Sequence, residues 1–183
     1  MKMRRAIFWS GVALFAVALA ALSPLALVTG CSRQSGEPAI FTGKVYSAEQ
    51  VRTACGWAYI GKTQYAEVNR DWLPWYYAQF RAEIAAGAYG VVKWEPNACC
   101  TFFASRFASG AQLHYFAQNW NTGLAANGIA VGKRWYTPAG GKVGHAIVQA
   151  VTQRGLEFFE PQTGQFVTLT DAEKAATQLS EFD

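Results

Sequence analysis

The chain has 183 residues, of which 16 are basic and 12 acidic, and its net charge is +4. Three basic residues lie within the first five positions, and all the acidic residues lie beyond residue 30, so residues 31–183 carry a net charge of only about +1. The remaining Lys and Arg residues are scattered along the chain. Because nucleic-acid binding usually needs a concentrated basic face, we expect no nucleic-acid partner.

The first 30 residues have the form of a secretory signal. Met1-Lys2-Met3-Arg4-Arg5 precedes an apolar run from Ala6 to Val28, which is interrupted only by Ser10, Gly11, Ser23 and Pro24. A basic start, an apolar middle and small residues near the end are typical of a signal peptide. The run is also long enough for a membrane-spanning helix, which needs about 20 apolar residues. A permanent anchor helix is therefore the alternative.

Cys31 stands at the end of this segment. The stretch Val28-Thr29-Gly30-Cys31 resembles the lipobox of bacterial lipoproteins, in which the cysteine is lipidated and the bond before it is cut. The resemblance implies a membrane partner, because Cys31 would carry several acyl chains and two or more chains hold a protein stably. Ser32 resembles the family's outer-membrane signal. The expected location is the bacterial cell envelope, on the outer membrane facing the periplasm if the source is Gram-negative.

The rest of the chain is long enough for one domain with a buried core. Residues 32–43 lack periodicity and contain Ser, Gly, Pro and Gln, so residues 31–43 are expected to be the lipidated cysteine and a flexible tether. Residues 44–183 are expected to fold as a single domain.

The first part of this domain is expected to be helical. Ser47 and Gln50 have the spacing of a capping box, which predicts a helix to about residue 60. Asp71 as N-cap and Pro74 in the first turn predict a second helix to about residue 86, before Gly87 as C-cap. Its aromatic side chains are interpreted as core: Trp72, Trp75, Tyr76 and Phe80.

Asn97 is the expected N-cap of a third helix at about 98–120, weakened near Ser109-Gly110. Short β-like segments follow at 129–136, 144–151, 156–160 and 165–169, separated by turn signals. Their close spacing predicts an antiparallel meander. Asp171 is expected to cap a last helix over about 172–179. Helices packed on a C-terminal antiparallel sheet make the fold class α+β.

Four cysteines bear on the chemistry: Cys31, Cys55, Cys99 and Cys100. With Cys31 lipidated, three thiols remain in an oxidising compartment, and an odd cysteine there is a candidate reactive thiol. Two arrangements stay open, namely a Cys55–Cys99 disulfide with a free Cys100, and three free thiols. The cysteines and the two histidines lack the close spacing of a structural zinc site.

Cys100 is the preferred candidate nucleophile, with Cys99 as the alternative. Both lie where a helix is expected to begin, and a helix N-terminus favours the thiolate. His145 opens an expected strand and can serve as the base, whereas His114 is interpreted as structural. If His145 stands opposite Gln162, then Glu160 is its diagonal neighbour on the same face. A slip of one residue would separate them.

Three stretches carry a resemblance to a known family: Cys100-Thr101-Phe102-Phe103-Ala104, His145-Ala146, and Phe159-Glu160-Pro161-Gln162-Thr163-Gly164. They resemble papain-like and transglutaminase-like cysteine peptidases, in particular a papain-like family that includes the C-terminal protease domain of a fungal agglutinin. The resemblance covers about residues 90–170. It implies a papain-like fold with Cys100 as nucleophile, His145 as base, and Glu160 or Gln162 orienting the imidazole.

Two functions follow as hypotheses. The first is a membrane-anchored thiol hydrolase or acyltransferase that acts on peptide or amide bonds, with a peptide or cell-wall substrate and the N–H of Cys100 as an oxyanion donor. The second is an inactive papain-like fold that serves as a binding or structural lipoprotein of the envelope. No phosphate loop, dinucleotide fingerprint or metal spacing is present in the sequence, so no cofactor is expected.

Overall fold

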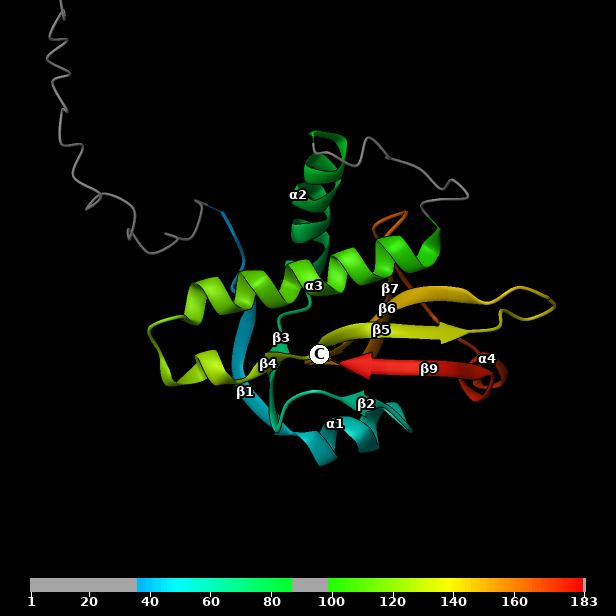
Figure 1. The fold of residues 1–183 in the computed structure, drawn as a ribbon, viewed down its shortest axis with the longest axis horizontal. Coiled ribbons are helices and arrows are strands. Elements are labelled where there is room, and N and C mark those ends of the chain that lie inside the picture. Colours follow the sequence, from blue (N-terminus) through cyan, green and yellow to red (C-terminus); the bar gives the residue numbers. More distant parts are fainter. Residues whose placement is uncertain (1–35, 87–98, 183) are drawn as a thin grey trace, which may run out of the picture.

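The computed structural model describes residues 36–86 and 99–182 (Figure 1). The expected signal segment 1–30, the expected lipidation site Cys31, and the candidate caps Gly87 and Asn97 lie outside these ranges. No helix of the described ranges is both long and apolar enough to cross a membrane. The elements, in chain order, are β1 (Phe41–Ser47), α1 (Ala48–Cys55), β2 (Tyr59–Ile60), β3 (Gln64–Val68), α2 (Trp72–Ala86), α3 (Cys100–Asn119), a 3-10 turn (Gly123–Ala126), β4 (Gly128–Ile129), β5 (Val131–Tyr136), β6 (His145–Thr152), β7 (Gly155–Glu160), β8 (Gln165–Val167), α4 (Asp171–Ala175) and β9 (Thr177–Phe182).

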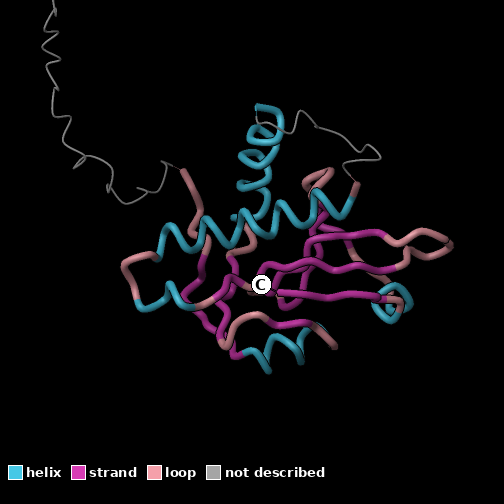
Figure 2. The backbone as a smooth tube through the Cα atoms, viewed as in Figure 1, coloured by secondary structure: helices cyan, strands magenta, loops and turns pink. Residues whose placement is uncertain are grey.

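Two sheets form the β part of this α+β fold. The larger has six strands in the order β2-β9-β5-β6-β7-β8, and the smaller has three in the order β1-β3-β4. The expected antiparallel meander is present as β5 to β8. The long helix α3 runs along one side of the larger sheet and α1 lies on the other (Figure 2). The expected helices and the expected C-terminal strands are thus largely present. The two sheets also contain β1, β2 and β3, which come from the first half of the chain.

The main core lies between α3, α2 and the sheet. Strand alternation directs the even-numbered residues of β6 toward α3, and these pack with the buried face of that helix. The aromatic residues of α2 join this core, as expected, since Trp72, Tyr76 and Phe80 are at most 2% exposed. The rings of Phe107 on α3 and Phe159 on β7 are 5.3 Å apart and tie the helix to the sheet.

The capping box at Ser47 is present, with both Ser47 and Gln50 side chains bonded to the backbone. The expected end of this helix near residue 60 is wrong, because α1 ends at Cys55. Gly56 follows with φ of +78°, a conformation that stops a right-handed helix and that glycine adopts without steric cost. Residues 59–60 then join the edge of the larger sheet as β2.

The last helix is also shorter than expected. Its N-cap is Thr170, not Asp171, and Thr170 forms a capping box with Glu173. Residues 177–182 form β9, which pairs antiparallel with β5 and parallel with β2. This pairing places the end of the chain in the middle of the larger sheet. A non-local partner therefore overrode the local helical signal.

The fold begins before the expected boundary at residue 44. Strand β1 starts at Phe41, inside the segment expected to be a tether, and Ile40 is 1% exposed within the main core. β1 pairs with β3, a strand that the sequence did not reveal. Residues 40–43 are therefore part of the domain, because they bury an apolar side chain and complete a sheet.

Helix α3 is continuous from Cys100 to Asn119, so the weakening expected near Gly110 is absent. A β-carbon at Gly110 would overlap the hydroxyl of Tyr76, which shows that the glycine allows α2 to approach closely. The N-cap of α3 is Cys99 rather than Asn97, and Cys100 is the first helical residue. His114 packs against Trp72 and Tyr76, with ring centroids 5.9 and 4.9 Å away.

Candidate functional site

His145 and Glu160 meet where β6 begins and β7 ends. The two strands pair with Val148 opposite Phe159 and Gln149 opposite Phe158, and this register extrapolates to His145 opposite Gln162. Glu160 is then the diagonal neighbour of His145 on the same face. The alternation of the strands thereby brings an imidazole and a carboxylate together across the hairpin.

The contact is short and well supported. The Nε2 atom of His145 lies 2.6 Å from Oε2 of Glu160, and the two side chains are 28% and 13% exposed. The other carboxylate oxygen, Oε1, accepts a hydrogen bond of 3.0 Å from the backbone N–H of Gln162. The turn after Glu160 is closed by a hydrogen bond of 2.8 Å from the N–H of Gly164 to the backbone carbonyl of Glu160. Both oxygens of Glu160 are therefore held in place.

This arrangement separates the roles of Glu160 and Gln162, which the sequence left open. Glu160 contacts the imidazole directly, whereas Gln162 acts on it through its backbone N–H to the carboxylate. The carbonyl of Gln162 also accepts a bond of 3.2 Å from the Tyr77 hydroxyl, which fixes the turn to α2. Glu160 is the group placed to orient His145.

The contact also distinguishes the two ring nitrogens of His145. A carboxylate that is ionised only accepts hydrogen bonds, so beside such a group the ring nitrogen that faces Glu160 is the donor. In the neutral ring the proton-accepting nitrogen is then Nδ1. Within the described ranges, Nδ1 has no hydrogen-bond partner. A base with one nitrogen anchored and the other open is suited to accept a proton from a neighbouring group.

Cys100 is half-buried at the start of α3 and packs against the main core. Its neighbour across the site is Tyr136, which stands opposite His145 in the β5–β6 ladder with ring centroids 5.8 Å apart. Burial raises the pKa of Tyr136, and the negative charges of Glu173, Glu160 and Cys100 raise it further. Cys100 and Glu160 therefore both lie within electrostatic reach of one tyrosine.

The structure does not join Cys100 to His145 by a hydrogen bond within residues 36–86 and 99–182. Alternation places His145, Glu160 and Tyr136 on the face of the sheet opposite α3, because Ala146 and Phe159 face the helix. Cys100, at the start of α3, and the His145–Glu160 pair therefore lie on opposite faces of the larger sheet. Tyr136 was missed from the sequence, although the Pro138 to Gly141 turn predicts a hairpin that sets it beside His145.

Cys99 has an environment of its own. The pKa of its thiol is lowered, chiefly because the backbone N–H of Phe102 favours the thiolate, and the N–H of Thr101 adds to this while partial burial opposes it. The sulfur does not complete a capping hydrogen bond. The first bond of the helix runs from the N–H of Phe103 to the Cys99 carbonyl, so the preceding N–H groups have no partner within the helix. An anion at this helix start would be stabilised by these groups.

The Cys55–Cys99 disulfide is not formed, and Cys55, Cys99 and Cys100 are all free. Cys55 lies in a separate core cluster with Val51 and Phe182, on the far side of the larger sheet from α3. Burial raises the pKa of its thiol to about 12, despite the opposing positive charge of Arg134. Cys55 is therefore an inert core residue.

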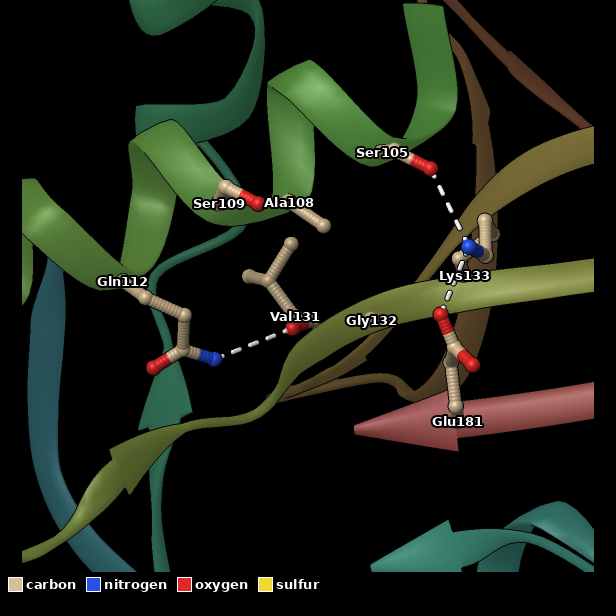
Figure 3. Close-up of a pocket in the computed structure, with 8 residues that line it drawn as sticks. All are labelled: Ser105, Ala108, Ser109, Gln112, Val131, Gly132, Lys133 and Glu181. Atoms are coloured by element: carbon tan, nitrogen blue, oxygen red, sulfur yellow. Dashed lines mark hydrogen bonds and ion pairs between the residues drawn. The ribbon is translucent and has the colours of Figure 1, made fainter. Parts of the chain in front are cut away.

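A small cavity lies between α3 and strands β5 and β9 of the larger sheet (Figure 3). Its volume is about 50 Å³, and Lys133 spans it by bonding Ser105 at 3.0 Å and Glu181 at 2.6 Å. It contains neither Cys100 nor His145. Across the described parts of the chain, no three His, Cys, Asp or Glu side chains gather as a metal site.

No family model matches the chain, and no curated protein matches it by sequence. Its fold is similar to that of Polyporus squamosus lectin bound to the human-type influenza-binding epitope Neu5Acα2-6Galβ1-4GlcNAc, with TM-score 0.56 and 17% identity over 75% of this chain and 49% of the lectin. It is also similar to the PSL1a–E64 complex, with TM-score 0.52 and 17% identity over 75% and 50%. The chain spans about half the length of these structures. It therefore shares its α+β fold with part of this lectin.

Proposed function

We propose that the protein is an exported, lipid-anchored thiol hydrolase or acyltransferase with Cys100 as its nucleophile. The observation that carries this proposal is the 2.6 Å contact between His145 Nε2 and Glu160 Oε2, which leaves Nδ1 open. The position of Cys100 at a helix N-terminus, and the fold shared with a protein solved in complex with E64, support it. The anchor rests on the lipobox ending at Cys31.

The proposed reaction begins with transfer of the Cys100 thiol proton to Nδ1 of His145. The thiolate attacks the carbonyl carbon of an amide, a C–S bond forms, and the C=O π pair moves to oxygen beside the N–H of Cys100. Collapse of this intermediate breaks the C–N bond, and the leaving amine takes the proton from the imidazolium. Water or a second amine then attacks the thioester and restores the thiol. Glu160 holds the imidazolium throughout by accepting from Nε2.

Alkylation at two pH values tests the pairing. The full-length protein in detergent is treated with iodoacetamide at pH 6.5 and pH 9, and the adducts are counted by mass spectrometry. Because the pKa of the Cys99 thiol is also lowered, by the backbone N–H of Phe102, Cys99→Ser isolates Cys100 and Cys100→Ser isolates Cys99. An ordinary thiol is only about 1% ionised at pH 6.5, so a thiol activated by His145 should react at least about tenfold faster there.

The decisive comparison adds His145→Ala to each background. Cys100 should lose its reactivity at pH 6.5, whereas Cys99 should keep its own, since the amides of Thr101 and Phe102 remain. Equal labelling of Cys100 with and without His145 would reject the mechanism. Treatment with E64 gives a second readout, because a thiolate opens its epoxide and leaves a mass adduct on the nucleophile.

The lipid anchor is tested separately by the mass of the protein recovered from membranes. We expect residues 1–30 to be absent and acyl chains to be attached to Cys31. Cys31→Ser should yield an uncut, unlipidated precursor. Wild-type protein that keeps residues 1–30 would contradict the anchor and favour a membrane-spanning N-terminal helix.

The second candidate is a binding protein of the envelope on the same fold, without catalysis. The absence of a hydrogen bond between Cys100 and His145 in the described ranges favours it, and the fold is shared with a lectin. Direct binding of the trisaccharide Neu5Acα2-6Galβ1-4GlcNAc, measured by calorimetry on a protein whose Cys100 shows ordinary reactivity, would support this alternative.

A further inference from the structure

An apolar strip lies on the outer side of α3. Leu113, Phe116 and Trp120 are 66%, 42% and 61% exposed, and their spacing of three and four residues places them on one side of the helix. The rings of Phe116 and Trp120 are in contact, with centroids 4.8 Å apart. The buried side of the helix, which includes Phe107 and Ala111, faces the opposite way. We call these three side chains the α3 strip.

The helix that carries the α3 strip has almost no charge. Cys100–Asn119 contains no Asp, Glu or Lys, and Arg106 is its one charged residue. A helix that faces water on one side normally carries charged residues there. Exposed apolar residues grouped on an uncharged helix mark a surface that is covered in the working protein.

The start of the described chain lies at the C-terminal end of α3, the end that carries Trp120. Oε1 of Glu37 accepts a hydrogen bond of 2.7 Å from Nε2 of Gln118, which is on the last turn of α3 but, two residues before Trp120, points to another side of the helix. Figure 1 shows the same relation, since the segment leading into β1 passes the C-terminal end of α3. Cys31 precedes Glu37 by only six residues, which span at most about 20 Å. An acyl chain on Cys31 would therefore hold this end of α3 close to the bilayer.

A second exposed aromatic pair lies elsewhere. Trp57 and Tyr59 are 69% and 62% exposed, but they follow α1, and Tyr59 belongs to β2 at one edge of the larger sheet. The bond of Glu37 to Gln118 places the start of the described chain at α3, whereas β1 and α1 separate it from this second pair. A short tether that ends at Glu37 therefore favours the α3 strip over the second pair.

We propose that the α3 strip rests on the lipid bilayer that holds the acyl chains of Cys31, with Phe116 and Trp120 in the interfacial layer. Tryptophan is enriched at this depth because its ring is apolar and its N–H is polar. The strip and the lipid together give two points of attachment on one side of the domain. Since Cys100 begins the same helix, this contact fixes the orientation of the candidate site relative to the membrane. The inference rests on the proposed lipid anchor.

Quenching of tryptophan emission by brominated lipid tests the contact. The full-length lipidated protein is reconstituted into phosphatidylcholine–phosphatidylglycerol vesicles with and without brominated acyl chains. We expect quenching in the wild type, loss of most of it in Trp120→Ser, and no loss in Trp57→Ser, which is the matched exposed control. Phe116→Ser keeps every tryptophan and should also reduce the quenching by at least about twofold.

The outcomes separate this proposal from the anchor. If mass spectrometry shows acylated Cys31 and the wild type is not quenched, the strip proposal fails and the anchor stands. If Cys31 carries no lipid, the anchor fails, and quenching of Trp120 by added vesicles would still support the strip. Quenching that depends on Trp57 instead of Trp120 overturns the strip proposal. So does a dimer that buries Trp120, seen by sedimentation and by protection of its emission from acrylamide.

Discussion

The hydrogen-bond network around Gln149 offers a sharp test of what stabilises the larger sheet. Gln149 is fully buried, and its Oε1 accepts from Nε of Arg134 at 3.0 Å while its Nε2 donates to Oγ of Ser180 at 2.8 Å. Arg134 is itself only 3% exposed. Its other polar contacts are the Cys55 carbonyl at 2.7 Å and the Thr177 hydroxyl at 3.3 Å, so no carboxylate of residues 36–86 or 99–182 balances its charge. The hydrogen bond from Arg134 to Gln149 thus helps to offset the cost of burying a guanidinium between β5, β6 and β9.

Gln149→Leu keeps the volume of the side chain but removes these bonds. A hydrogen bond to a charged group contributes about 1.5–3 kcal/mol, and each neutral partner left unpaired in the interior costs about 1 kcal/mol or more. The free energy of unfolding should therefore fall by about 3–5 kcal/mol. For a domain of this size that corresponds to a decrease of about 10 °C in Tm.

Urea denaturation followed by tryptophan fluorescence measures the effect on the full-length protein in detergent. Gln178→Leu is the matched control, because Gln178 is exposed and bonds only the Thr137 hydroxyl, at 3.0 Å. The control should change the free energy of unfolding by no more than about 0.5 kcal/mol. A loss below about 1 kcal/mol in Gln149→Leu would refute the role assigned to the network.

Three further predictions concern the site and the core. Glu160→Gln should slow alkylation of Cys100 at pH 6.5 by about tenfold, because the imidazole of His145 loses its orienting carboxylate. Glu157→Gln, on the same strand, should leave the rate unchanged. Equal rates in the two variants would contradict the orienting role of Glu160. Gly110→Ala should lower the free energy of unfolding by about 1–3 kcal/mol, because the new methyl group overlaps Tyr76, and a neutral result in urea denaturation would argue against that close packing. Folding raises the pKa of Cys55 from 9.0 to about 12, so its contribution to stability is complete below pH 9 and is lost as the pH rises toward 12. Cys55→Ala should flatten the decline in stability between pH 9 and 10 by up to about 1.4 kcal/mol per pH unit, and an unchanged slope would contradict the shift.

Several elements could be predicted because their signals are local. The capping box at Ser47 and the alternation in β5 to β8 depend on residues a few positions apart. The diagonal contact of His145 with Glu160 depends on one hairpin register, which the short turn between β6 and β7 determines. Local spacing was sufficient for these features.

Other features depended on partners far along the chain. Residues 177–182 became β9 because β5 and β2 offered free strand edges, although residues 177–179 were expected to end the last helix. Residues 40–43 joined the fold because β3 and the core accept them, and Arg134 is buried because Gln149, Thr177 and the Cys55 carbonyl surround it. Strand pairing and burial of polar groups join residues that are distant in sequence, and no local pattern encodes them.

The sequence by itself determined the order Cys100, His145, Glu160, the helix and the strands that carry them, and the apolar segment that precedes Cys31. Only the tertiary structure decided that Glu160 rather than Gln162 contacts the imidazole, that the three described cysteines stay free, and that Glu37 bonds Gln118 at the C-terminal end of α3. The reason is physical. The chemistry of each side chain can be read from the sequence, but the distance between two side chains depends on how all the elements between them pack.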